Sequence, residues 1–578
     1  MIQGNYFTTN EDILLHFNTL IDWNEIIEAY EHGFKDSKIF KETGNDLYAN
    51  APSSVDEAID YYRTILDTMG SVTGNYVSQL VREMDKEKLK FENGKIHYPK
   101  ALIDSVNKLK ETGLMPYGFR RKFGGLGIPF IVRTFLGEIL YRTDGSAGIT
   151  FACANLAEIL ENIASEEMQN EWLPRIAAGE FTVSMGLTEP DHGSDLPNIR
   201  TRATKKEDGT WILNGTKRFI TQAAGFENTQ GIILTLARTG EEGSGARGLS
   251  FFLVQSKHIQ VLSIESKLGL HCSPTCEVIM EDTPGLLIGK EGLGLIRYTM
   301  GMLNGARMGV ASQGTGLATA AYEEAKKYAS QRIQFGKPLN ELGAIKKILD
   351  RMEREILGMR CLMVEGSRMV DLYLWKAEHL KEEGIPEREV SRNESLKYWE
   401  KMAGIYTPIS KFFCAEMCNK IAYDALQIHG GSGFTEEYDI ARIYRDARIT
   451  SIYDGTSQIQ VMAAIGGIVS GMSLNGQFRD YVTKQMNAIN ASPKLNNLFK
   501  ILEKTVIEYK NISPELKEGF ATEVVESAAR FLCSLLLEKS LVPLADEKYA
   551  KRREHTGEYL IDSIAIAEGN LYRIAAKR

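Results

Sequence analysis

The helix-forming and strand-forming stretches of this chain occupy separate parts of the sequence, and this segregation restricts the folds open to it. Up to residue 180, apolar residues recur three to four positions apart, as on one face of a helix. Between 181 and about 282 the chain changes to short segments rich in β-branched and aromatic residues, separated by Gly, Asp and Asn. The helical spacing returns after residue 294. Because strands do not alternate with helices, the order argues against a parallel βαβ nucleotide-binding fold.

The pattern predicts an α+β protein with a helical part, a small antiparallel β domain, a second helical part and a helical extension. We place these parts at residues 1–180, 181–290, 291–470 and 471–578. Within the two helical parts, helices are expected over 55–68, 76–86, 158–177, 298–332, 344–375, 393–428 and 459–469. In the extension, SLNGQF and NASPKLNN have the composition of loops, and two amphipathic helices are expected over 515–539 and 544–575.

Charge and composition exclude several classes of function. The net charge is −8, with acidic and basic residues mixed along the chain, which argues against a general nucleic-acid binder. The chain does not open with a basic segment followed by an apolar stretch, and no apolar run reaches membrane-spanning length. We therefore expect a cytoplasmic protein without a membrane span.

Cysteines and glycines give no binding motif by themselves. Seven cysteines are present, and the close pairs Cys272/Cys276 and Cys414/Cys418 have no second pair or histidine at zinc-finger spacing. Reduced, mostly buried thiols and no metal site are therefore expected. The glycine clusters GKEGLGL and HGGSGF lack the strand–glycine–helix context of a dinucleotide fingerprint.

Four segments, in order along the chain, carry a more specific signal. They are MGLTEPDHGSDLPNIRTRA (185–203), NGTKRFITQA (214–223), RIQFGKPL (332–339) and QIHGGSGFTEEYDIARIYRDARITSIYDGTSQIQ (427–460). Together they resemble the acyl-CoA dehydrogenase family, whose members carry T-E-P-x-x-G-S-D, N-G-x-K-x-W/F-I-T, R-x-x-F-G-K and I-Y-E-G-T-x-x-I-Q at these places. The resemblance covers roughly residues 60–470, and with its extension the chain is similar to the longer branch of the family.

The resemblance implies the family's fold, which has an N-terminal helical domain, a middle antiparallel β domain and a C-terminal four-helix bundle, here with an extra helical C-terminal domain. It also implies FAD, bound between the β domain and the bundle at the contact of a homodimer. Thr188, with the backbone from Met185 to Leu187, would meet the polar edge of the flavin ring. Phe219 and Thr221 would cover the far side of the ring, where an aromatic residue excludes water.

The resemblance also implies residues that a neighbouring subunit contributes to the flavin site, further residues that contact the cofactor, and residues near the substrate. Arg332 and Phe335 would come from the neighbouring subunit, with Arg332 pairing the pyrophosphate. Further cofactor positions are Gln427, Gly430, Gly431, Thr456 and Gln458, and the positions near the acyl-CoA substrate are Ser194, Asn304, Arg307, Tyr453 and Gly455. His192 and His429 stand beside these motifs and are interpreted as packing or surface residues.

Asp454 stands where the family has the glutamate of I-Y-E-G-T, the base that removes the α-proton of the acyl thioester while the flavin takes a hydride from the β-carbon. Some members place this glutamate one residue before the arginine matched by Arg307, and here that residue is Ala306. Asp454 is therefore the sole carboxylate at a motif position for the base. Burial should raise its pKa toward neutrality. The side chain of aspartate is one methylene, roughly 1 Å, shorter than that of glutamate. A carboxylate misplaced by this distance can cost about a hundredfold in rate.

Several explanations of the aspartate remain open beside simple tolerance. The acyl group could be branched or ring-bearing and sit closer to the base, the proton could leave a different carbon, or the protein could be a weakened relative. A different class is a flavin-binding scaffold or DNA-associated relative, for which the sequence offers one basic run, KYAKRRE (548–554). The resemblance favours an acyl-CoA dehydrogenase that passes electrons to electron-transferring flavoprotein. The acyl group and the direction, oxidation or enoyl reduction, are left open.

Overall fold

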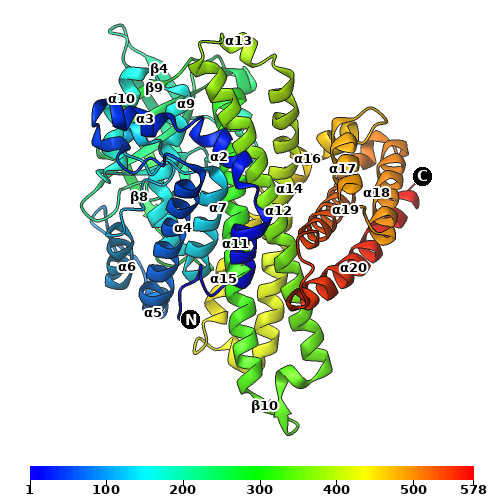
Figure 1. Cartoon of the computed structure of the whole chain (residues 1–578). Helices are drawn as coiled ribbons and strands as arrows, with labels where there is room; N and C mark the ends of the chain where they lie inside the picture. Colours follow the sequence, from blue (N-terminus) through cyan, green and yellow to red (C-terminus); the bar gives the residue numbers. More distant parts are fainter. Residues whose placement is uncertain (578) are drawn as a thin grey trace. The chain divides into compact units, whose positions relative to one another are not determined.

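The computed structural model describes residues 1–577, and these residues form two compact units (Figure 1). The first unit holds Met1–Thr9 and Gly33–Leu303, and the second holds Asn10–His32 and the described residues from Asn304 onward. Each unit has its own buried core.

The first unit begins with helices. They are α3 (Lys35–Thr43), α4 (Val55–Val72), α5 (Ser78–Lys86), α6 (Lys100–Lys110), α7 (Phe130–Thr143), α8 (Gly145–Ala152), α9 (Ile159–Ile163) and α10 (Glu166–Ala177). The helices expected over 55–68 and 76–86 are confirmed. The helix expected over 158–177 is interrupted, because Ser165 starts a new helix by accepting a hydrogen bond from the amide of Met168.

A short hairpin interrupts the helices, and the helical interpretation of residues 1–180 missed it. It pairs β1 (Lys90–Glu92) with β2 (Lys95–His97) in antiparallel register. Asn93 and Gly94 both have positive φ, as a tight hairpin turn requires. The Asn-Gly dipeptide was the signal that could have predicted it.

The sheet of the first unit has seven strands. They are β3 (Phe181–Gly186), β4 (Arg202–Lys205), β5 (Trp211–Thr221), β6 (Gln230–Arg238), β7 (Leu249–Gln255), β8 (Gln260–Ile264) and β9 (Thr275–Ile288). The expectation of a purely antiparallel sheet was wrong, because β6 runs parallel to both β3 and β4. The chain between β3 and β6 forms the β4–β5 hairpin and then returns in the original direction.

Five of these strands form a closed path, in which β6, β4, β5, β9 and β7 are joined and β7 pairs again with β6. Successive residues of a strand face opposite sides, and β6 serves two cores in this way. Ile232, Leu234 and Leu236 pack with helix residues such as Trp172. Ile233 packs into the core inside the closed path. The β strands and the preceding helices are therefore parts of one packed unit.

The second unit is a bundle of long helices. They are α11 (Met300–Gln331), α12 (Gly343–Glu382), α14 (Glu394–His429) and α16 (Ser457–Gly471), with the shorter α13 (Glu387–Val390) and α15 (Ile440–Ala447). These bounds confirm the helices expected after residue 294. At one end of the bundle a hairpin of β10 (Ile333–Gln334) and β11 (Lys337–Pro338) follows α11 (Figure 1).

The N-terminal segment Asn10–His32 belongs to the second unit, which the sequence did not indicate. It contains α1 (Glu11–Leu15) and α2 (Trp23–Glu31). The carboxylate of Asp12 pairs with Arg360 of α12 and with Arg552 of the C-terminal extension. Buried ion pairs therefore join the first and last helices of the chain to the bundle.

The C-terminal extension folds as four helices. They are α17 (Gln477–Ala488), α18 (Pro493–Asn511), α19 (Pro514–Leu541) and α20 (Ala550–Ala575). The two helices expected over 515–539 and 544–575 correspond to α19 and α20, but α17 and α18 were missed. The NASPKLNN segment is not a loop, because Ser492 caps α18 and Pro493 occupies its first position.

Two further expectations can be compared with the structure. All seven cysteines are free and buried, as expected. Within residues 1–577, none of the helices is both long and apolar enough to cross a membrane.

Candidate active site

The predicted base, Asp454, lies in a tight turn between the 3-10 turn Arg448–Ser451 and α16. Its backbone is left-handed (φ +51°), and so is that of Gly455 (φ +84°). Asp and Gly occupy this region at smaller cost than most residues. A Cβ at Gly455 would lie 2.6 Å from the side-chain amide nitrogen of Gln460, which favours glycine there. The Asp454-Gly455 pair is thus a turn, and it carries a half-buried carboxylate.

Three hydrogen bonds fix the backbone of this turn. The Lys411 ammonium donates to the Gly455 carbonyl at 2.7 Å. The side-chain amide of Gln460 donates to the same carbonyl at 3.0 Å and to the Asp454 carbonyl at 3.1 Å. Beyond the turn, Thr456 caps α16. Because the donors come from α14 and α16, two helices of the bundle set the position of the turn.

The charges around the turn act on one another. Burial raises the pKa of Asp454 above its ordinary value, and the positive charge of Lys411 opposes this rise. Burial also lowers the pKa of Lys411 to about 8, against the attraction of the Asp454 and Glu416 carboxylates. A carboxylate with a raised pKa suits the removal of a proton from carbon.

Two of the expected substrate positions lie together near the start of α11. The guanidinium of Arg307 donates to the side-chain oxygen of Asn304 at 3.0 Å, and Thr407 of α14 donates to the same oxygen at 3.0 Å. Arg307 is buried, and its Nε has no hydrogen-bond partner among the described residues. A buried cation with a spare donor is suited to hold a polar group of a ligand. Ala306 stands beside it without a carboxylate.

A second group of expected residues lies at the end of the bundle near β10. Arg332 and Phe335 belong to the hairpin after α11, and the ring of Phe335 is 89% exposed. Gln427, Gly430 and Gly431 lie at the end of α14. The rings of Tyr328 and His429 stack at 4.4 Å and hold the two helix ends together. His429 is thus a packing residue, as expected.

The glycines at this end leave an open surface. Gly430 has a positive φ of 58°. A Cβ on Gly430 or Gly431 would meet no atom of the described residues within 4 Å. Open glycine backbone and an exposed arginine are each suited to approach by a phosphate group.

The two groups of residues in the second unit are far apart. Lys411, beside the Asp454 turn, and His429 are 18 residues apart on α14. At about 1.5 Å per residue this is roughly 27 Å. One bundle therefore carries the base at one level and the exposed arginine and glycines at another.

In the first unit, the expected flavin positions lie at the end of β3, just after it, and at the end of β5. Met185, Leu187 and Thr188 are half-buried, and the amide of Arg218 donates to the Thr188 carbonyl at 2.9 Å. Phe219 follows Arg218 and is 54% exposed, with a positive φ of 63°. The pairing of β5 with β9 shifts register between Lys217 and Ile220, and this bulge turns the Phe219 ring outward.

A buried ion pair supports the loop after β3. The ammonium of Lys217 donates to the Leu187 carbonyl at 3.1 Å and to the Glu189 carboxylate at 2.8 Å. That carboxylate also accepts from the amides of Arg200 and Thr201, at 2.6 and 2.9 Å. Both ends of the loop that carries Ser194 and His192 are therefore attached to Glu189. Ser194 itself is exposed.

Burial governs the pKa values of this pair. It lowers the pKa of Lys217 to about 8, although Glu189 attracts the proton. Burial alone would raise the pKa of Glu189, but Lys217 and the donors of Thr201 and Arg200 hold it below its ordinary value.

Each unit by itself offers groups of the kind that the implied cofactor needs. In the first unit, Phe219 offers an exposed aromatic face, and Thr188 and Thr221 are half-buried hydroxyl residues. In the second unit, Arg332 offers an exposed cation and Gly431 offers bare backbone. These are the groups that a flavin ring and a pyrophosphate require. The contacts of each residue with the cofactor or with CoA stay predictions.

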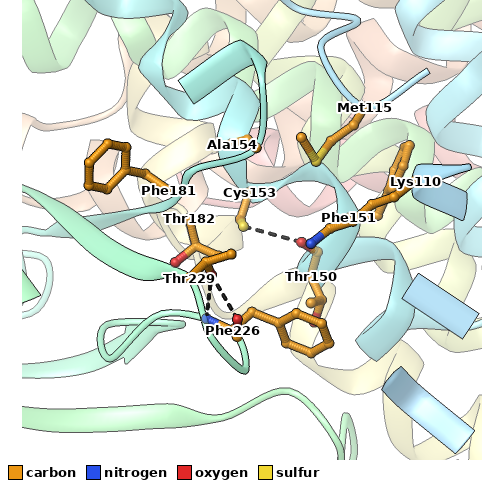
Figure 2. Close-up of a pocket in the computed structure, with 11 residues that line it drawn as sticks. Lys110, Met115, Thr150, Phe151, Cys153, Ala154, Phe181, Thr182, Phe226 and Thr229 are labelled. Carbon is orange, nitrogen blue, oxygen red and sulfur yellow. Dashed lines mark hydrogen bonds between the residues drawn. The ribbon is translucent and has the colours of Figure 1, made fainter. Parts of the chain in front are cut away.

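One small cavity in the first unit has no place in this site (Figure 2). Its volume is about 10 Å³, room for at most one water molecule. Cys153 lines it and donates to the Thr150 carbonyl at 3.2 Å, and burial raises the pKa of its thiol to about 11. The cavity is therefore too small for a ligand, and its thiol is not a nucleophile.

A cluster of possible metal ligands in the second unit is already neutralised. Asp350, Glu353 and His555 place ligand atoms within 4.8 Å of one another. The Lys551 ammonium and the Tyr322 hydroxyl both donate to Glu353 at 2.6 Å. The cluster is therefore an ion-pair network between α12 and α20.

Three side chains of the site were missed by the sequence interpretation. Lys411, Lys217 and Glu189 anchor the two loops that carry the predicted base and flavin positions. Lys217 and Glu189 lie within the quoted motifs, but no role was assigned to them. The signal for Lys411 was a lysine in the apolar segment PISKFF of a helix.

Comparison with known proteins covers most of the chain. Three family models match in order, described as acyl-CoA dehydrogenase N-terminal domain over residues 61–180, middle domain over 184–283 and C-terminal domain over 294–467. The chain is 32% identical over 430 residues to 3-methylmercaptopropionyl-CoA dehydrogenase of Ruegeria pomeroyi. The match spans 71% of this chain and 70% of that protein.

Solved structures show the same similarity. A chain of "Electron transferring flavoprotein of Acidaminococcus fermentans: Towards a mechanism of flavin-based electron bifurcation" is 29% identical, with a TM-score of 0.58, over 70% of this chain and 97% of that one. An acyl-CoA dehydrogenase from Bacillus anthracis in complex with FAD is similar in fold, with a TM-score of 0.74 at 22% identity. The match covers 90% of this chain and 89% of the Bacillus anthracis chain, so it includes part of the C-terminal extension.

Proposed function

The chain belongs to the acyl-CoA dehydrogenase family, whose members are FAD-dependent oxidoreductases, and from this premise we propose that Asp454 is its catalytic base. The protein would introduce an α,β double bond into an acyl-CoA thioester. The observation that carries the proposal is the Asp454 turn, in which a half-buried carboxylate of raised pKa stands on a backbone fixed by Lys411 and Gln460.

In the proposed reaction, the Asp454 carboxylate takes the α-proton of the acyl chain and becomes a carboxylic acid. FAD, when bound, would supply the acceptor for the β-hydrogen and the two electrons that leave with it. The raised pKa of Asp454 makes its carboxylate a stronger base than an exposed aspartate. Phe219 would keep water from the reacting atoms, and the spare donor of Arg307 would hold the CoA portion.

The shorter arm of aspartate favours a particular class of substrate. Because the backbone carbonyls of Asp454 and Gly455 are both held by the Gln460 side chain, the turn cannot easily move to make up the missing methylene, roughly 1 Å. A branched or alicyclic acyl group, which brings its α-carbon closer to α16, would restore the distance. Proton removal from a different carbon and a weakened enzyme remain the competing explanations.

We also propose that the protein is a homodimer in which each subunit completes the flavin site of the other. The support is the separation of roughly 27 Å along α14 between the base level and the end that carries Arg332, Gly430 and Gly431. Two groups so far apart on one bundle are suited to serve two sites.

Electron-transferring flavoprotein is the proposed electron acceptor. The support is the similarity to a chain of an electron-transferring flavoprotein structure from Acidaminococcus fermentans. The alternative of a DNA-associated scaffold rests on one basic run, two cations of which are paired within the chain. In the basic run 548–554, Arg552 is buried against Asp12 and Ser540, and Lys551 donates to Glu353.

The test of the proposed base is Asp454→Asn, which keeps the size of the side chain and removes its basicity. We expect FAD content and CoA-ester binding to stay near the wild-type level. Reduction of the bound FAD by butyryl-CoA, isobutyryl-CoA or cyclohexanecarboxyl-CoA should fall by several orders of magnitude. Asp480→Asn, at an exposed position of α17, is the matched control. Wild-type reduction by Asp454→Asn would mean that the base lies elsewhere.

Asp454→Glu then separates the explanations of the shorter arm. If aspartate suits a bulky acyl group, the glutamate should slow the branched or alicyclic ester and speed butyryl-CoA. If the aspartate is a loss of function, the glutamate should restore activity on butyryl-CoA outright.

A further inference from the structure

Lys411 is a lysine without exposure to solvent, in the middle of α14. Burying an ammonium group is costly unless it is paired, and lysine is rarely buried completely. Its hydrogen bond goes to the carbonyl of Gly455, the residue that follows Asp454. The position of this charge beside the predicted base requires an explanation that packing does not give.

Charged groups face Lys411 from three elements. They are Asp454 in the turn before α16, Glu416 on α14 itself and Arg307 on α11. Glu416 accepts a hydrogen bond from the Ser457 hydroxyl at 2.5 Å, so it is engaged by the start of α16. Asp454 has no such donor to its carboxylate among the described residues, and Lys411 is the cation that acts on it.

The hydrogen bond by itself does not account for a lysine. Gln460 already donates to both the Asp454 and the Gly455 carbonyls. A neutral donor or an apolar side chain at 411 would fill the same space without the cost of burying a charge. A charge is of use where another charge must be stabilised, and the nearby group that carries the proposed chemistry is Asp454.

We propose that Lys411 is a positioning residue for the catalytic base, which holds the carbonyl of Gly455, the residue after Asp454, in place and keeps the Asp454 carboxylate ionised between turnovers. This inference rests on the proposed function of Asp454. The anchoring acts through the Gly455 carbonyl at 2.7 Å, directly behind the carboxylate-bearing residue. Because aspartate has a short arm, a displaced backbone cannot be compensated by a side-chain rotation.

The charge of Lys411 sets a range of pH for the base. Burial raises the pKa of Asp454, and without Lys411 the rise would be larger. A nearby opposite charge lowers a carboxyl pKa, by about 1–3 units when it stands within ~4–6 Å. Asp454 must be deprotonated and Lys411 protonated, and the pKa of Lys411 is about 8. The rate of flavin reduction should therefore fall at acidic pH and again above about pH 8.

The test uses the FAD-loaded full chain with Lys411→Met and Lys411→Gln. Glutamine keeps a donor for the Gly455 carbonyl and removes the charge, whereas methionine removes both. Lys420→Met, an exposed lysine on the same helix, is the matched control. Each variant is mixed with a saturating amount of the ester that reduces the wild type fastest, and bleaching of the flavin is followed in a stopped-flow instrument from pH 5 to pH 10.

We expect Lys411→Met to lower the maximal reduction rate about 10- to 100-fold, with CoA-ester affinity nearly unchanged. Its acid limb should move up by about one pH unit, and its alkaline limb near pH 8 should disappear. Lys411→Gln should recover most of the rate but keep both changes in the pH profile. If Lys411→Met loses its FAD, the profile of Lys411→Gln decides alone.

A wild-type rate and an unshifted acid limb in the charge-free variants would overturn the inference. Asp454→Asn, measured beside them, separates the two proposals. If Asp454→Asn abolishes reduction while the Lys411 variants behave as wild type, the role of Lys411 is wrong and the base stands. If Asp454→Asn reduces flavin normally, the proposed base itself is wrong.

Discussion

The ion pair Lys217–Glu189 should hold the loop that is predicted to meet the flavin ring, and removal of one partner tests this. Lys217 is fully buried and Glu189 is nearly so. We expect Glu189→Gln to destabilise the loop more than Lys217→Met. In both variants, FAD retention should fall, because Leu187 is attached through its carbonyl to Lys217.

The structure gives the expected size of the effect. Breaking a buried pair by removing one partner costs about 3–5 kcal/mol. In Lys217→Met, the Glu189 carboxylate keeps the two amides of Arg200 and Thr201, which places the cost at about 3 kcal/mol. In Glu189→Gln, the amide oxygen can still accept from Lys217 and Thr201, but the NH₂ group faces the backbone amide of Arg200, and the buried Lys217 ammonium loses its counter-charge. The cost should then approach 5 kcal/mol.

The pH dependence has a definite sign. Burial lowers the pKa of Lys217 from 10.5 to about 8 in the folded protein. Between these values the unfolded chain binds more protons, so the contribution of Lys217 to stability rises with pH. Glu189→Gln removes the attraction that keeps the proton on Lys217. In this variant the rise should therefore begin below pH 8, and the loss of stability should shrink at alkaline pH.

Hydrogen exchange of the amides of Arg200 and Thr201 measures the effect locally, since both donate to Glu189. A loss of about 3 kcal/mol corresponds to roughly 150-fold faster exchange. Lys205→Met, an exposed lysine on β4, is the control. The double variant should lose less than the sum of the single ones, because no buried charge remains. Exchange rates and FAD content equal to those of the wild type in both single variants would refute the reasoning.

Two further predictions concern the cofactor and the extension. Arg332→Ala should lower FAD retention, whereas the control Arg202→Ala, at an exposed residue on β4, should not. Equal FAD content of the two variants after gel filtration would contradict the role of Arg332. An FAD-saturated monomer would contradict the shared site. Arg530 of α19 is buried, and its Nη1 donates to both oxygens of Glu355 on α12, at 2.7 and 2.8 Å. Glu355→Ala should therefore lower the free energy of unfolding by about 3–5 kcal/mol. It should also expose the extension to limited proteolysis. A cost below about 1 kcal/mol, typical of an exposed pair, would show that this pair does not fasten the extension.

Local pattern was enough to predict much of the fold. The helical spacing located α11, α14 and α16 within about two residues and the start of α12 within one, although α12 runs on to Glu382, past the expected end at 375, because each helix buries one continuous face. It failed where the local signal was short. The β1–β2 hairpin rested on a single Asn-Gly pair, and the break before α10 rested on one capping serine.

The sequence by itself determined which chemistry the chain carries, because its motifs are short and contiguous. Asp454, Phe219 and Arg332 could be numbered from their neighbours in the chain. Periodicity shows that a face is buried but not what buries it. Only the tertiary structure decided that Asn10–His32 joins the second unit, and that Lys411, 43 residues before Asp454, lies behind it. Buried charges find their partners through packing between distant helices, and no local pattern records such a pairing.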